Sequence, residues 1–81
     1  MSNTVRHLKI QRFGEKLRSL RERNNMNHAD LAHSLGYAST NQIYQLEAGK
    51  RNPTADLILK VSKLFDVSAD VLVDDELEVG E

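Results

Sequence analysis

The stretch NHADLAHSLG occupies residues 27–36, and the stretch TNQIYQLE follows it at residues 40–47. The first stretch opens with a helix start signal, because Asn27 can cap a helix and Asp30 stands three residues later, as in a capping box. Apolar residues then recur at helical spacing until Gly36, which can adopt the positive φ that many helix ends require. Together the two stretches predict two short helices that meet at a glycine turn.

The second helix of this pair presents an outer face without charge. Its cap is predicted at Ser39 or Thr40, and Ile43 and Leu46 are predicted to face the core. At about 100° per residue, these inward positions turn amide, hydroxyl and phenol groups outward. Amide side chains can pair with adenine N6 and N7, so this face suits contact with base edges in a major groove. The outward residues are Asn41, Tyr44, Gln45 and Ala48, with Thr40 and Gln42 beside them.

The rest of the chain also shows helical patterns. Apolar residues at helical spacing predict a first helix over about residues 9–24, ended by the asparagines at 24–25. Thr54 caps a fourth helix that ends near Asp66, and Ser68 caps a short fifth helix. The sequence contains no strand pattern and no internal repeat. It therefore predicts a single all-α domain of five short helices.

Charge is distributed unevenly along the chain. Residues 1–73 contain 11 basic and 7 acidic residues, a net charge of +4, whereas the last eight residues contain five acidic and no basic residues. This acidic end brings the whole chain to a net charge of −1. The overall charge therefore conceals a basic domain, which suits a polyanionic partner such as nucleic acid.

Three segments follow from these patterns: a flexible amino-terminal arm at 1–8, a helical domain at 9–73 and an acidic tail at 74–81. The basic residues at the amino end, Arg12 among them, are expected to be solvated. The tail has three interpretations. It is a disordered solubilising segment, an extension of the last helix towards a partner subunit, or a screen for the basic surface.

Composition excludes several classes of function. The chain has no cysteine, and its three histidines do not have the spacing of a metal site, so no metal and no cofactor are expected. It shows no set of nucleophile, base and orienting group, so we expect no enzyme. It also lacks an apolar run long enough to cross a membrane, and no signal peptide is recognised. We expect a cytoplasmic protein without a membrane partner or a small-molecule ligand.

Six spaced motifs cover residues 13–73: Phe13-Gly14, Leu17-Arg18-x-Leu20-Arg21, Asn27-x-x-Asp30-Leu31-Ala32, Leu35-Gly36, Ile43-x-x-Leu46-Glu47-x-Gly49-Lys50-Arg51-x-Pro53 and Leu64-Phe65-x-Val67-Ser68. In this order they resemble the Cro/repressor-like, xenobiotic-response-element type of helix-turn-helix family found in bacterial and phage regulators. The resemblance implies a compact, lambda-repressor-like fold of five helices. Helices two and three would form the helix-turn-helix, with helix three in the major groove of double-stranded DNA.

The resemblance also implies roles for individual residues. The base-contacting residues would be Thr40, Asn41, Gln42, Tyr44 and Gln45. The phosphate-contacting residues would be Asn27, His28, Lys50, Arg51 and Asn52. Arg21 and Glu47 match a pair that forms a structural salt bridge between the first and third helices in this family. If that pair is buried, removing one partner would leave an uncompensated charge.

This sequence departs from the family pattern at three places. His28 stands where the family usually has Gln, Asn25 stands where it usually has Gly, and the 36–43 spacing is one residue longer than the commonest form. His28 has two interpretations: an exposed residue of the first turn, or an imidazole that contacts phosphate when protonated. In the second case DNA affinity would rise as the pH falls. The longer spacing leaves two neighbouring registers for the third helix.

The resulting functional hypothesis is a sequence-specific transcriptional regulator, most often a repressor in this family, that acts as a homodimer on a palindromic operator. No Arg or Lys precedes Lys50 on the outer face of the third helix, so the usual guanine contact is missing there. We therefore expect half-sites that rely on A·T pairs. The alternative is an antitoxin-like or adaptor module whose main partner is another protein, with little salt-sensitive DNA binding.

Overall fold

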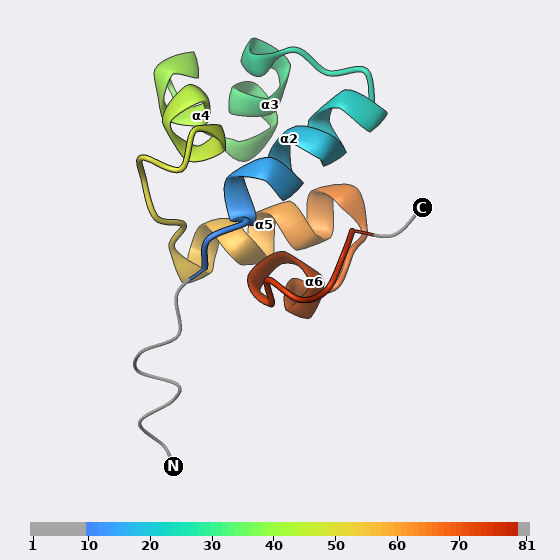
Figure 1. Cartoon of the computed structure of the whole chain (residues 1–81). Coiled ribbons are helices and arrows are strands. Elements are labelled where there is room, and N and C mark those ends of the chain that lie inside the picture. Colours follow the sequence, from blue (N-terminus) through green and yellow to red (C-terminus); the bar gives the residue numbers. More distant parts are fainter. Residues whose placement is uncertain (1–9, 80–81) are drawn as a thin grey trace.

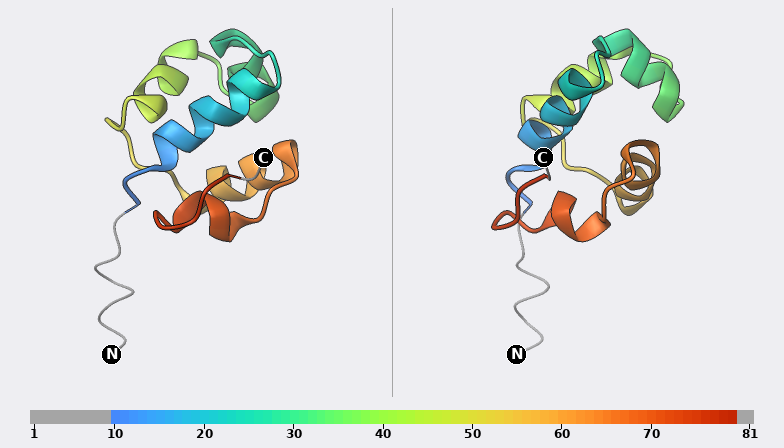
Figure 2. Two further views of the ribbon diagram at one scale, coloured as in Figure 1. Left: turned by 45° about the vertical axis from the view of Figure 1, so that its right-hand side comes forward. Right: turned by 90° about the vertical axis from the view of Figure 1, so that its right-hand side faces the viewer.

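The computed structural model describes residues 10–79, and these form five α-helices without a strand (Figure 1). The helices are α2 (Phe13–Arg23), α3 (His28–Leu35), α4 (Thr40–Glu47), α5 (Ala55–Phe65) and α6 (Ala69–Val73). Figures 1 and 2 show α2, α3 and α4 grouped on one side of the domain, with α5 and α6 on the other. The flexible arm expected at residues 1–8 lies outside the described residues.

Local interactions fix both ends of α3 and the start of α4. Asn27 Oδ1 accepts a hydrogen bond from the Asp30 backbone N–H at 2.7 Å, and Asp30 Oδ2 accepts one from the Asn27 N–H at 3.0 Å. The predicted capping box is therefore confirmed. Gly36 ends α3 with φ of 81°, and the Ser39 hydroxyl accepts from the Asn41 N–H at 3.1 Å to begin α4. Short-range chemistry thus sets both helix ends.

The first helix begins later than predicted. It starts at Phe13, whereas the periodicity predicted a start near residue 9. The Asp75 carboxylate accepts hydrogen bonds from the backbone N–H groups of Gln11 and Arg12, at 3.1 and 3.0 Å. These two donors thus have an acceptor from the far end of the chain. The prediction was wrong here because that acceptor is distant in sequence.

The core lies where the helices meet, and its packing fixes the distance between α2 and α4. A Cβ added to Gly14 would clash with the backbone oxygen of Leu46 and lie 2.7 Å from that of Glu47. Only glycine therefore allows this close approach of α2 to the end of α4. The buried apolar side chains include Phe13, Leu17, Leu20, Leu31, Leu35, Ile43, Leu46, Leu57, Val61 and Leu72.

Lys16 is buried in this core, although lysine is seldom buried. Its side chain is 1% exposed. The Nζ group donates to the backbone oxygens of Val71 and Asp74, at 2.6 Å each. These carbonyls lie at the end of α6, where a helix carries partial negative charge. Lys16 therefore joins α2 to the carboxyl end of α6.

The acidic tail packs against the domain over residues 74–79. The α6 helix ends at Val73, so the tail does not extend it. Val79 is 8% exposed and belongs to the core. Figure 2 shows this dark red segment beside the blue start of the described chain. Neither the disordered form nor the helical form considered for the tail matches these residues, because contacts with α2 and the core hold them.

Arg12 makes most of the polar contacts that hold the tail. Its guanidinium lies 2.7 Å from Glu78 Oε1 and 2.9 Å from Glu15 Oε2, and it donates to the Asp75 backbone oxygen at 2.6 Å. Arg12 is thus paired, not merely solvated as expected. Hydrogen bonding from the Arg12 side chain lowers the pKa of Glu78. The Arg12 backbone N–H, followed by that of Gln11, lowers the pKa of Asp75.

Candidate nucleic-acid interface

The outer face of α4 has the orientation that the periodicity predicts. Ile43 and Leu46 are 0% and 1% exposed and face the core. On the opposite face Asn41 and Tyr44 are exposed, and Tyr44 is 54% exposed. The flanking polar residues Thr40, Gln42 and Gln45 are half-buried. The helix therefore presents neutral hydrogen-bonding groups to solvent and no charged group before Glu47.

A buried ion pair holds α4 against α2. Arg21 Nε lies 2.7 Å from Glu47 Oε2, and the two side chains are 9% and 7% exposed. Arg21 also donates to Glu47 Oε1 at 3.2 Å and to the Met26 backbone oxygen at 3.0 Å. The hydrogen bond to Glu47 raises the pKa of Arg21 above its ordinary value. This is the pair proposed from the sequence, and it fixes the carboxyl end of α4.

His28 has an intramolecular role that sequence reasoning missed. Its Nε2 lies 3.3 Å from Glu47 Oε1, so the Glu47 carboxylate contacts both Arg21 and His28. Its ring stacks on that of Tyr44, with centroids 4.0 Å apart and planes 17° apart. These contacts depend on how α3 packs on α4. The only sequence signal was the departure from the usual Gln at position 28.

The other candidate phosphate contacts lie just before α3 and in the loop after α4. Asn27 is exposed, and its cap uses the side-chain carbonyl and not the amide NH₂ group, which can donate two hydrogen bonds. After α4, the Lys50 backbone N–H donates to the Gln45 backbone oxygen at 2.9 Å, so the start of the basic loop stays close to the helix. Lys50, Arg51 and Asn52 are all exposed.

Sequence comparison gives the family. The sequence model of the helix-turn-helix family matches residues 17–72, which is more than half of the chain. The chain belongs to this helix-turn-helix family. The match confirms the predicted resemblance to Cro/repressor-like proteins, and α3 and α4 are the two helices of the motif. No curated protein sequence matches the chain.

Solved structures share the fold of this helix-turn-helix protein. The restriction-modification controller protein C.AhdI from Aeromonas hydrophila is 28% identical, with a TM-score of 0.65 over 74% of this chain and 89% of that one. The P22 c2 repressor in complex with synthetic operator 9T is 29% identical, with a TM-score of 0.70 over 76% of this chain and 92% of that one.

The DNA-binding domain of the P22 c2 repressor in solution is also similar, at 28% identity and a TM-score of 0.72 over 86% of this chain and 91% of that one. These likenesses confirm the predicted five-helix, lambda-repressor-like fold. No helix within residues 10–79 is long and apolar enough to cross a membrane.

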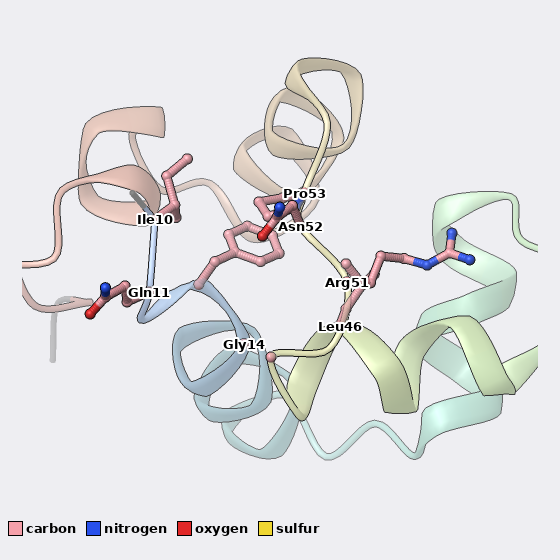
Figure 3. Close-up of a pocket in the computed structure, with 9 residues that line it drawn as sticks. Ile10, Gln11, Gly14, Leu46, Arg51, Asn52 and Pro53 are labelled. Atoms are coloured by element: carbon pink, nitrogen blue, oxygen red, sulfur yellow. The ribbon is translucent and has the colours of Figure 1, made fainter. Parts of the chain in front are cut away.

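A cavity of about 570 Å³ lies on the core side of the helix-turn-helix (Figure 3). It opens between the start of α2, the end of α4 and the loop after α4, and Gly14, Leu46 and Pro53 contribute to its walls. Figure 3 shows the Arg51 side chain extending away from the cavity, on the side where α3 and α4 lie. The Arg51 guanidinium therefore lies outside the cavity, on the side of the helix-turn-helix.

Proposed function

We propose that this helix-turn-helix protein, a DNA-binding transcriptional regulator, is a sequence-specific repressor that binds a palindromic operator as a homodimer. The observation that carries the proposal is the neutral, hydrogen-bonding face of α4, held by the buried pair of Arg21 and Glu47. The P22 c2 repressor, whose structure was determined with a synthetic operator, has the same fold and supports this function.

In this proposal the outer face of α4 enters the major groove. The amides of Asn41, Gln42 and Gln45 can each donate to N7 and accept from N6 of an adenine, and each such pair discriminates against a wrong base by about 1–3 kcal/mol. Tyr44 adds an aromatic contact, and Thr40 adds a hydroxyl. Since α4 has no basic side chain, a guanine contact is absent from its centre and A·T pairs are favoured.

Phosphate contacts supply most of the affinity. In this proposal the contacts come from Asn27, just before α3, and from the exposed loop residues Lys50, Arg51 and Asn52 after α4. This arrangement can hold the two backbone strands that border a major groove. If each subunit of a dimer neutralises about four phosphates, a plot of the logarithm of the binding constant against the logarithm of the salt concentration should have a slope of about −7.

The proposal includes a dimer because the DNA contact of one subunit is small. One helix contacts only a few base pairs, and two subunits place two α4 helices in successive major grooves, about 34 Å apart. Exposed apolar side chains are available for a contact between subunits, at 54% exposure for Leu59, 40% for Leu64 and 42% for Leu77. We expect sedimentation of the free chain to show a dimer at micromolar concentration.

The proposal is tested by titrating duplex DNA with the whole chain at several salt concentrations. A steep salt dependence together with preference for one duplex supports it, and a slope shallower than about −2 contradicts it. Lys50→Ala should weaken binding to all duplexes and reduce the magnitude of the slope by about 1. The matched control is Lys63→Ala, an exposed lysine on α5, which should leave both quantities unchanged.

A further inference from the structure

The ring of His28 covers one side of Tyr44, an exposed side chain on α4. The centroids of His28 and Tyr44 are 4.0 Å apart and the planes are nearly parallel, at 17°. Tyr44 is 54% exposed, so its other side remains open to solvent. An exposed tyrosine on a helix ordinarily exchanges among staggered rotamers. Contact with a second ring restricts that exchange.

The histidine ring is itself held in place. Its Nε2 lies 3.3 Å from Glu47 Oε1, and because a carboxylate only accepts hydrogen bonds, Nε2 carries the hydrogen. Glu47 is 7% exposed and is fixed in turn by Arg21, at 2.7 Å. The charged and titratable groups around His28 are therefore Glu47 and Tyr44 from α4 and Arg21 from α2. A chain of contacts connects the core to the tyrosine ring.

We propose that His28 is a positioning residue for Tyr44, and that it fixes the direction in which this tyrosine meets DNA. The inference rests on the proposed function of α4. Because the stack restricts the ring before binding, less conformational entropy is lost when Tyr44 contacts a base or a phosphate. The role differs from the phosphate contact that the family resemblance implies, since Nε2 is already used by Glu47 and the ring face is already used by Tyr44.

The stack has a consequence in the free protein. A neighbouring aromatic ring shifts the proton resonances of the tyrosine ring, so Tyr44 should show displaced ring protons in NMR spectra. His28→Ala should return these resonances towards exposed tyrosine values, and His28→Phe should keep them displaced. The second tyrosine, Tyr37, serves as the internal reference. Undisplaced Tyr44 resonances in the unmodified chain would overturn the proposal without any DNA experiment.

The consequence for DNA is measured by a double-mutant cycle on a selected duplex. His28→Ala and Tyr44→Ala should each weaken specific binding. The loss of affinity in the double variant should be about 2- to 10-fold smaller than the product of the two single losses, which is the range expected of one aromatic pair. In the Tyr44→Ala background, His28→Ala should therefore cost less than it does alone. His28→Phe should recover part of the affinity that His28→Ala loses, and His28→Gln should not.

His33→Ala, an exposed histidine on α3, is the control and should leave affinity unchanged. Thermal melts of every variant separate loss of folding from loss of positioning. If the unmodified chain binds duplex DNA specifically but the two losses are independent, or His28→Gln equals the unmodified chain, only the positioning role is overturned. If the unmodified chain binds no duplex, the proposed function fails and the inference fails with it.

Discussion

Replacing Glu47 with alanine removes the carboxylate on which α2, α3 and α4 converge. That carboxylate accepts two hydrogen bonds from Arg21, at 2.7 and 3.2 Å, and one from His28 at 3.3 Å. Without it, Arg21 keeps its hydrogen bond to the Met26 backbone oxygen but remains a charge at 9% exposure. Breaking a buried pair in this way costs about 3–5 kcal/mol.

That cost is a large fraction of the stability of the domain. A chain of 81 residues has a free energy of unfolding of roughly 4–12 kcal/mol. One kcal/mol shifts the melting temperature of a domain of this size by about 4–8 °C. Glu47→Ala should therefore lower the melting temperature by more than about 12 °C, measured by circular dichroism and checked by urea unfolding.

Two further variants isolate the cause of this loss. Glu22 lies 3.9 Å from Arg21 but is 55% exposed, so Glu22→Ala should change stability by less than about 1 kcal/mol. Replacing both members of the buried pair, as Arg21→Met with Glu47→Leu, should recover much of the loss because no buried charge is left alone. A Glu47→Ala protein that melts within about 3 °C of the unmodified chain would refute this reasoning.

Three other variants test the contacts around the start of α2. Gly14→Ala should destabilise the domain by about 1–3 kcal/mol in urea unfolding, since its Cβ would meet backbone at the end of α4; an unchanged midpoint would contradict that contact. Lys16→Met should cost about 1–3 kcal/mol because two carbonyls lose their donor, and a more stable variant would show that burying the charge outweighs them. The pKa values of Asp75 and Glu78 are lowered in the folded state, so their contribution is present at neutral pH and is lost as the pH falls below about 4. The stability difference between the unmodified chain and the Asp75→Asn, Glu78→Gln protein should vanish in acid, and a difference that persists at about pH 2 would count against the carboxylates.

Local chemistry made much of this fold predictable. The capping pair of Asn27 and Asp30 acts over three residues, and Gly36 ends α3 by its own backbone conformation. Asn25, one of the two asparagines predicted to end the first helix, adopts a positive φ of 56°. The inward position of Ile43 follows from periodicity alone. These features depend on residues close in sequence, and so the sequence predicted them.

Contacts between distant residues were not predictable in the same way. Asp75 reaches the start of α2 from 64 residues away, and nothing near Gln11 signals that acceptor. Lysine is seldom buried, and nothing near Lys16 in the sequence signals that the end of α6 supplies two acceptors for it. The stack of His28 on Tyr44 likewise depends on how two helices pack.

Selection of binding sites from random duplex DNA, with the whole chain and with its Asn41→Ala variant, decides whether α4 recognises base sequence. We expect the unmodified chain to select two A·T-rich half-sites related by two-fold symmetry, about one helical turn apart. Asn41→Ala should lose the preference at one position of each half-site while still binding at low salt. Failure to enrich any sequence, or the same motif from both proteins, would contradict recognition by this helix.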